Sequence, residues 1–153
     1  NLAAALLAEG RENEAIAHLS DALRLRPNSA EAHNNLGAAL FALGRIKEAT
    51  THLAETVRLN PGSSNAHYNL AAALNSQGQL DEAIVHYSSA VRIDPGNATA
   101  HNDFGNALVR QGKLDEAISH YSAALLIKPD HAESRNNLAA VRARHAQQKE
   151  AAK

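Results

Sequence analysis

The sequence predicts an all-α fold, a solenoid of stacked helix–turn–helix repeats, on three observations. The prolines recur at an interval of 34 residues, at Pro27, Pro61, Pro95 and Pro129. Glycines keep the same interval, at Gly10, Gly44, Gly78 and Gly112. The stretch AHNNLGAAL at 32–40 returns as AHYNLAAAL at 66–74 and as AHNDFGNAL at 100–108. A fixed period of this length indicates a repeat array, and the alanine-rich composition favours helix.

The first helix of each repeat is predicted from its leucine spacing. In the third repeat it covers roughly 64–76, where Leu70 and Leu74 lie four residues apart on one face. Gly78 ends this helix, because glycine adopts the left-handed backbone conformation that terminates helices. We expect the same break at the equivalent glycine of every repeat.

The second helix of the third repeat covers roughly 80–93, with apolar residues along one face. Asp81 and Glu82 stand in its first turn, where carboxylates complement the helix dipole. Pro95 stops the helix, because the residue before a proline disfavours helical geometry. Each repeat is therefore a helical hairpin followed by a proline-containing connection.

This pattern resembles the tetratricopeptide repeat, a helix–turn–helix unit of 34 residues. The family's signature leucine and the small residue after it are matched by Leu36–Gly37, Leu70–Ala71 and Phe104–Gly105. The small residue of the second helix and the large residue four positions later are matched by Ala49 and Leu53, Ala83 and Tyr87, and Ala117 and Tyr121. Two positions depart: histidines (His33, His67, His101) replace the tryptophan, and leucines (Leu40, Leu74, Leu108) replace the tyrosine. The resemblance covers residues 1 to about 141 and implies a right-handed α-solenoid.

We expect a single array over residues 1–153, made of a partial repeat, three full repeats and a capping helix (1–28; 29–62, 63–96 and 97–130; 131–153). In the last segment Arg142, Arg144 and Ala146 replace the expected leucine and glycine. No turn signal follows, so we predict one long final helix whose polar side caps the array. Because the chain begins inside a repeat, the sequence indicates a piece of a longer protein.

One register of the first helices forms the main candidate binding site. It is occupied by Asn1, Asn35, Asn69, Asp103 and Asn137. A carboxamide carries both a donor and an acceptor, so we expect each asparagine to hold the C=O and the N–H of a bound peptide together. Asp103, when ionised, can only accept, which suits a peptide N–H or a lysine.

The same column, together with the sequence motif AHNNLG, resembles the tetratricopeptide arm of the O-linked N-acetylglucosamine transferases. That resemblance implies that the first helices line a concave groove and that the asparagines grip a protein or peptide in extended conformation. Flanking positions on the same surface complete the predicted site: Asn34, Tyr68, Asn102, Asn106 and Arg110. Phe41 and Tyr68 are candidates for apolar pockets. Capture of an acidic C-terminus is disfavoured, because Ala38 and Ala72 stand where a clamp needs polar groups and only Arg110 is basic.

The composition argues against several other functions. The net charge of −1 predicts no attraction to nucleic acid or to an anionic membrane. No apolar run reaches the roughly 18 residues that a membrane-spanning helix needs. The absence of cysteine excludes disulfides and thiolate metal sites, and no phosphate-binding glycine loop is present. We expect no cofactor.

The histidines and serines do not predict a metal or catalytic site. The histidines fall in two columns, His33, His67 and His101 on first helices and His18, His52, His86 and His120 on second helices. None are three or four residues apart, and columns one helix width apart should spread the ligands. The Ser–His pairs in SHYS at 119–122 and VHYS at 85–88 are features of the repeat, so we predict no enzyme activity in these residues.

Three functions therefore stay open. The first is a module that binds extended peptides, and the second is the substrate-recognition arm of a larger glycosyltransferase. The third is a scaffold that associates end to end, because the incomplete first repeat should leave Leu2, Leu6 and Leu7 with less cover than an internal repeat supplies.

Overall fold

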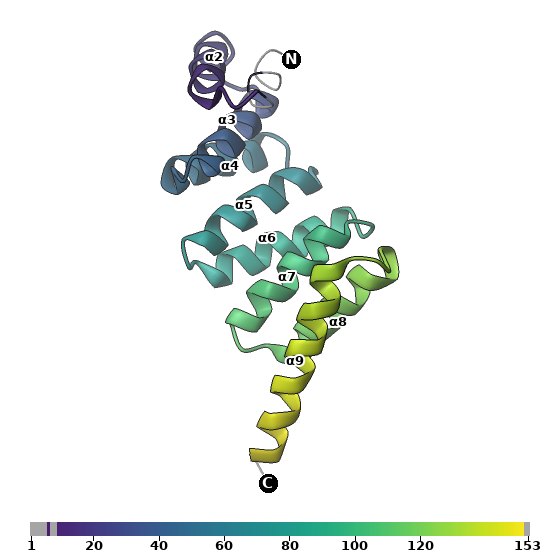
Figure 1. The fold of residues 1–153 in the computed structure, drawn as a ribbon. Helices are drawn as coiled ribbons and strands as arrows, with labels where there is room; N and C mark the ends of the chain where they lie inside the picture. Colours follow the sequence, from purple (N-terminus) through teal and green to yellow (C-terminus); the bar gives the residue numbers. More distant parts are fainter. Residues whose placement is uncertain (1–5, 7–8, 152–153) are drawn as a thin grey trace. The chain divides into compact units, whose positions relative to one another are not determined.

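The computed structural model describes residues 6 and 9–151, and the fold is all-α, as predicted (Figure 1). Within each of the two units described below, consecutive helices pack antiparallel as helical repeats. The described residues form α2 (Glu12–Leu25), α3 (Ala30–Ala42), α4 (Ile46–Leu59), α5 (Ser64–Ser76), α6 (Leu80–Ile93), α7 (Ala98–Arg110), α8 (Leu114–Ile127) and α9 (Ala132–Ala151). In this described part no helix is long and apolar enough to cross a membrane.

The chain divides into two compact units, Asn1–Gln79 and Leu80–Lys153, here called the N-terminal and C-terminal units. In the N-terminal unit α3 packs on α2 and α4, and α5 packs on α4 and touches α3. In the C-terminal unit α7 packs on α6 and α8, and α9 packs on α8 and touches α7. Each unit thus places two first helices side by side, α3 with α5 and α7 with α9.

Local sequence signals set the ends of the first helices. Ser29 and Ser63 cap α3 and α5, where each side chain accepts a hydrogen bond from a backbone N–H three residues later, at 3.2 Å. Asn97 caps α7 in the same way at 2.9 Å. The predicted breaks are confirmed at Gly44 and Gly112, whose φ values of 74° and 83° lie in the left-handed region.

Small residues allow the two helices of a repeat to pack closely. Ala49 and Ala117 are fully buried, with no exposed surface. A Cβ added at Gly37 would lie 2.6 Å from the side chain of Leu53, and one added at Gly105 would lie 2.6 Å from Tyr121. The glycine after the signature leucine or phenylalanine is therefore required by packing rather than by backbone conformation.

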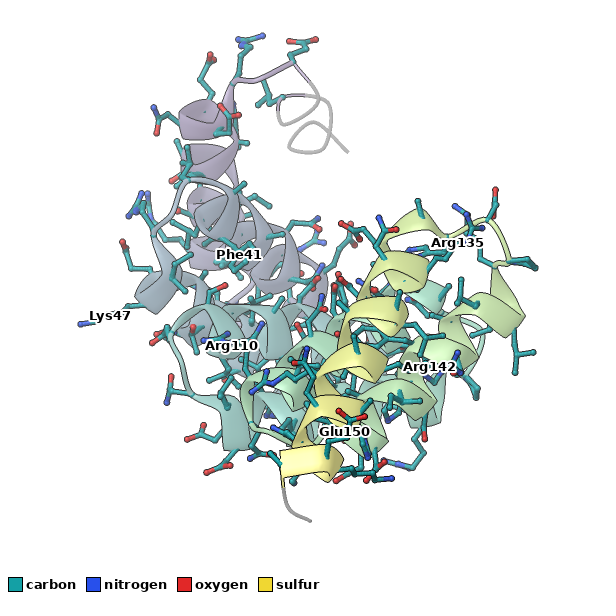
Figure 2. All side chains as sticks on the ribbon, turned by 60° about the horizontal axis from the view of Figure 1, so that its bottom comes forward. Phe41, Lys47, Arg110, Arg135, Arg142 and Glu150 are labelled. Carbon is teal, nitrogen blue, oxygen red and sulfur yellow. The ribbon has the colours of Figure 1, made fainter. Side chains whose placement is uncertain are left out.

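The chain ends in one long helix, as predicted. Helix α9 has 20 residues, and its buried side chains are Ser134, Leu138 and Val141. Arg135, Arg142 and Glu150 lie along it at intervals of about two helical turns (Figure 2). Its role as a cap stays a prediction.

At the start of the chain, one prediction is wrong. Leu6 was expected to have less cover than an internal repeat supplies, but only 4% of its surface is exposed. Leu2 and Leu7 lie outside the described residues. Of the three leucines expected to be uncovered, the one that the structure describes is therefore buried.

Candidate peptide-binding site

The predicted column is divided between the two units: in the N-terminal unit it lies on α3 and α5, and in the C-terminal unit on α7 and α9. The surface that these two helices form in each unit is here called the first-helix face of that unit. Asn35, Asn69, Asp103 and Asn137 are each half-buried, one on each of these helices. Their positions follow from the helix period, because the next residue in each case (Leu36, Leu70, Phe104, Leu138) is buried in the core. Asn1 lies outside the described residues.

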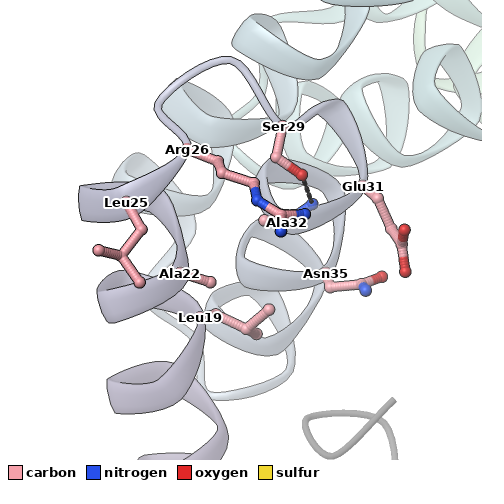
Figure 3. Close-up of a pocket in the computed structure, with 8 residues that line it drawn as sticks. All are labelled: Leu19, Ala22, Leu25, Arg26, Ser29, Glu31, Ala32 and Asn35. Carbon is pink, nitrogen blue, oxygen red and sulfur yellow. Dashed lines mark hydrogen bonds between the residues drawn. The ribbon is translucent and has the colours of Figure 1, made fainter.

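Asn35 borders a surface cavity of about 350 Å³ between α2 and α3 (Figure 3). Leu19 and Leu25 supply its apolar wall, and Leu25 is 85% exposed. Glu31 and Arg26 add one charge of each sign. The side-chain amide of Asn35 has no hydrogen-bond partner within the described part of the chain, so within that part both its donor and its acceptor are unused.

Asn69 borders a smaller cavity of about 140 Å³ in the N-terminal unit. Phe41 and Tyr68, the two aromatic residues expected to form apolar pockets, both line it, and Leu53 lies among them. Ala38 and Ala72 complete the wall, and their small side chains leave the space open. The cavity matches the size of one aliphatic side chain and carries a carboxamide at its edge.

Asn137 borders the third cavity, of about 390 Å³, in the C-terminal unit. Val109, Val141 and Tyr121 form its apolar part. Arg110 and Arg144 both line it, from α7 and α9. The sequence analysis included Arg110 in the site but placed Arg144 only in the capping helix. The 34-residue interval between the two arginines was the signal that could have identified it.

In the N-terminal unit the carboxamides of neighbouring first helices are linked. The Nδ2 of Asn69 donates to Oδ1 of Asn34 at 2.9 Å. The link leaves the Nδ2 donor of Asn34 and the Oδ1 acceptor of Asn69 without partners among the described residues. Asn69 also keeps the second N–H of its Nδ2, so it still offers one donor and one acceptor, while Asn34 offers donors.

The C-terminal unit repeats this arrangement. The Nδ2 of Asn137 donates at 3.1 Å to Oδ1 of Asn106 and at 3.1 Å to Oδ1 of Asn102. The hydroxyl of Tyr121 also donates to Oδ1 of Asn106, at 2.7 Å. Within the described residues, Nδ2 of Asn106 has no acceptor and Oδ1 of Asn137 has no donor, so both remain able to bind a partner. Among the described asparagines of the column, a single carboxamide can therefore hold both groups of a peptide at Asn35 and at Asn69, but not at Asn137, whose two N–H groups are both used.

Tyr121 is a reliable donor at neutral pH. Burial and, to a smaller extent, the carboxylate of Asp103 raise the pKa of its phenol to about 12. The phenol therefore stays protonated and keeps Oδ1 of Asn106 turned inward, which leaves the Asn106 amide nitrogen directed away from that contact.

The prediction that Asn102 contacts a partner is wrong for this arrangement, because only 1% of its surface is exposed. Its Oδ1 accepts from Oγ of Ser134 at 3.0 Å as well as from Asn137. Its Nδ2 donates to Oδ1 of Asp103 at 3.2 Å. Asn102 therefore lies buried beneath the predicted column and positions two of its residues, Asp103 and Asn137.

The two histidine columns meet instead of spreading apart. The Nδ1 atoms of His33 and His52 lie 3.0 Å apart, and those of His101 and His120 lie 3.0 Å apart. Across the described residues no group of three or more metal-ligating side chains gathers in one place. In SHYS, Oγ of Ser119 donates to the backbone carbonyl of Asp115 at 3.2 Å, which is a helix-internal contact and not a Ser–His pair.

Comparison with family models finds tetratricopeptide sequences along nearly the whole chain. A model described as "Tetratricopeptide repeat" matches residues 6–74. A model described as "TPR repeat" matches 72–112 and 105–145. No curated protein matches the chain.

Solved structures share the fold. MamA 41-end from Desulfovibrio magneticus RS-1 is 26% identical, with a TM-score of 0.89 over 99% of this chain and 86% of that one. YrrB, described as a TPR protein with an unusual peptide-binding site, is 26% identical, with a TM-score of 0.83 over 94% of this chain and 74% of that one. The first TPR of Spaghetti (RPAP3), bound to an HSP90 peptide, is 23% identical, with a TM-score of 0.74 over 76% of this chain and 93% of that one.

Proposed function

Because the chain belongs to the tetratricopeptide repeat family, we propose that it binds extended segments of a partner protein along the first-helix face of each unit. One observation carries this proposal: Asn35, Asn69 and Asn137, the three described asparagines of the column, each border a cavity with an apolar wall. An extended peptide presents backbone amides and side chains together, so it can use carboxamide and cavity at once.

The unused hydrogen-bonding atoms support recognition of peptide backbone. Asn34 and Asn69 together offer N–H donors and the acceptor Oδ1 of Asn69, and Asn106 and Asn137 together offer N–H donors and the acceptor Oδ1 of Asn137. A peptide group needs such a combination, an acceptor for its N–H and a donor for its C=O. Since these atoms contact the backbone of the peptide and not its side chains, they supply affinity without sequence preference.

Sequence preference comes from the cavities. The cavity beside Asn69, lined by Phe41 and Tyr68, suits an aliphatic side chain. The cavity beside Asn137 suits an acidic side chain, because Arg110 and Arg144 line it and charge-assisted hydrogen bonds to a carboxylate are strong. We therefore expect a partner segment that carries both aliphatic and acidic residues. YrrB, whose description names a peptide-binding site, is consistent with this class of function.

The test is selection of short random peptides on the wild-type chain, followed by titration of the selected peptide into variants. Asn35→Ala removes an amide that has no hydrogen bond of its own in the described structure, so it should weaken binding without loss of stability. Asn13→Ala, an exposed asparagine on α2, is the matched control. Equal affinities for wild type and Asn35→Ala/Asn69→Ala would contradict the proposal.

A second candidate is the substrate-recognition arm of a larger glycosyltransferase, motivated by the column Asn35, Asn69 and Asn137 and its likeness to the arm of the O-linked N-acetylglucosamine transferases. The comparisons find only tetratricopeptide repeats in these residues, so any catalytic domain would belong to another part of a longer chain. The sequence of the full parent protein decides this, since a parent made only of repeats would exclude it.

A further inference from the structure

Two registers of the repeat hold histidines that pair across the helical hairpin. His33 on α3 faces His52 on α4, with ring centroids 5.2 Å apart and Nδ1 atoms 3.0 Å apart. His101 on α7 faces His120 on α8, with centroids 5.3 Å apart and Nδ1 atoms 3.0 Å apart. The same geometry occurs independently in both units, and each pair joins the two helices of one repeat.

The hydrogen of each pair can be assigned. Nε2 of His33 lies 3.0 Å from the carbonyl oxygen of Pro27, which can only accept. Neutral His33 therefore carries its hydrogen on Nε2 and presents a lone pair at Nδ1. The hydrogen between the rings must then come from Nδ1 of His52. His101 is likewise hydrogen-bonded to the backbone of Pro95, so His120 supplies the hydrogen in the second pair.

The two rings tolerate one extra proton but not two. If His33 is protonated, its Nδ1 becomes a donor, and His52 can shift its hydrogen to Nε2 and accept. If both rings are protonated, two N–H groups and two positive charges meet at 3.0 Å. We propose that these histidine pairs make the repeats acid-sensitive: each pair holds its hairpin together with at most one added proton, and the second proton separates the two helices.

The neighbouring charges only partly offset this effect. Burial and then the charge of His33 lower the pKa of His52, while Glu48, on the same helix, raises it. Glu48 is itself held by Arg45, at 2.7 Å. The hydrogen bond from Arg58 and, to a smaller extent, the charge of His33 lower the pKa of Glu55. Among the described residues, no charged group of α2 or α5 contributes to the pKa of His52.

The C-terminal unit shows the same balance. Burial and then His101 lower the pKa of His120, while Glu116 raises it. Burial lowers the pKa of His101, while the Pro95 backbone and Asp94 raise it. The ring of Phe104 packs 4.1 Å from His120 and adds no charge. In the described part, no charged group of α6 or α9 contributes to either pKa.

The lowered pKa values of His52, His101 and His120 determine how stability changes with pH. In the unfolded chain each histidine takes up its proton near its ordinary pKa of about 6.5. In the folded chain the second proton of each pair binds only at lower pH, so the unfolded state binds more protons there. Stability is therefore complete above about pH 6.5 and is lost as the pH falls toward the lower pKa of the folded pair.

The experiment compares urea unfolding midpoints between about pH 7.5 and about pH 5.5, above the range in which ordinary carboxylates are protonated. In His52→Gln/His120→Gln the glutamine amide can donate to the partner histidine but cannot take up a proton. The acid-induced fall of its midpoint should be at most half that of wild type. His18→Gln, at the same register but exposed and without a histidine ring against it among the described residues, should fall like wild type. Equal falls for wild type and double variant would overturn the proposal.

A measurement on the unaltered chain keeps the proposal testable if the variant does not fold. Nitrogen NMR of the imidazole rings above neutral pH distinguishes the two tautomers. His52 and His120 should carry their hydrogen on Nδ1, and His33 and His101 on Nε2. Finding all four rings with the hydrogen on Nε2 would contradict the shared hydrogen, and with it the acid sensitivity.

Discussion

Asn69 donates a hydrogen bond from Nδ2 to Oδ1 of Asn34, 2.9 Å away on the preceding first helix. Asn137 and Asn102, with the same separation of 35 residues, make the equivalent bond at 3.1 Å. The carboxamides of this face thus connect neighbouring repeats before they bind anything. They hold each other in a fixed orientation, and the N–H groups and the oxygen that the link does not use are left for a partner.

The link predicts a stability effect at Asn69. Asn69→Asp replaces the donor by a carboxylate that faces Oδ1 of Asn34, so it should destabilise the chain by about 1–2 kcal/mol. Asn35→Asp, in the same register but without such a bond, should change stability by less than about 0.5 kcal/mol. Urea unfolding of both variants checks this, and equal effects would show that the link contributes nothing.

The close approach at Gly105 predicts a packing defect. Gly105→Ala places a Cβ 2.6 Å from the ring of Tyr121, which is buried and held by its bond to Asn106. Because the ring cannot move aside, overpacking should exceed the gain in helix propensity of about 1 kcal/mol and leave a net loss of about 1–3 kcal/mol. Gly96→Ala, whose Cβ would meet only Oδ1 of Asp94 at 3.5 Å, is the control. Thermal melting of both variants distinguishes them, and a Gly105→Ala variant as stable as wild type would be inconsistent with this packing.

Much of the fold could be predicted from the sequence because the signals that end its helices recur: the glycines and the prolines each occur four times at an interval of 34 residues. The glycines at the helix ends, the capping serines and the leucines of the core are local signals, and each recurs at one interval. The half-buried position of Asn35 and Asn69 follows from the neighbouring leucines, which fix the helix face by their spacing.

The contacts between helices could not be predicted in this way. Asn34 and Asn102 share a register, yet Asn102 is buried because Ser134 and Asn137 of the next first helix close over it. The histidines meet at a separation of 19 residues, which no helical period indicates, because the hairpin turn brings them together. Such pairings depend on the crossing of two helices and not on the pattern along one.

The cavity beside Asn69 predicts a specific loss of binding. Ala38→Leu should fill the space of about 140 Å³ between Phe41 and Tyr68 and exclude an aliphatic side chain of the partner. We expect the affinity for the selected peptide to fall about tenfold, equivalent to ~1.4 kcal/mol. Ala42→Leu, exposed on the same helix and outside this cavity, should bind like wild type. Calorimetric titration measures both, and an unchanged affinity for Ala38→Leu would exclude this cavity from the site.

The two arginines predict a salt-dependent preference for acidic peptides. Arg110→Gln/Arg144→Gln should bind an acidic selected peptide more weakly, and its affinity should depend less on ionic strength, because screened charge pairs have been removed. Arg142→Gln, also exposed on α9 but absent from this cavity, is the matched control. If the double variant and wild type show the same salt dependence, the cavity beside Asn137 does not select acidic residues.

The most direct test of the central claim follows the side-chain amide signals of the asparagines by NMR while the selected peptide is added. Binding along the first-helix face of each unit should shift the signals of Asn35, Asn34 and Asn106, whose amide nitrogens have no partner among the described residues, and leave that of Asn13 unchanged. A peptide that binds without moving any of the three would contradict the claim that these carboxamides hold the partner.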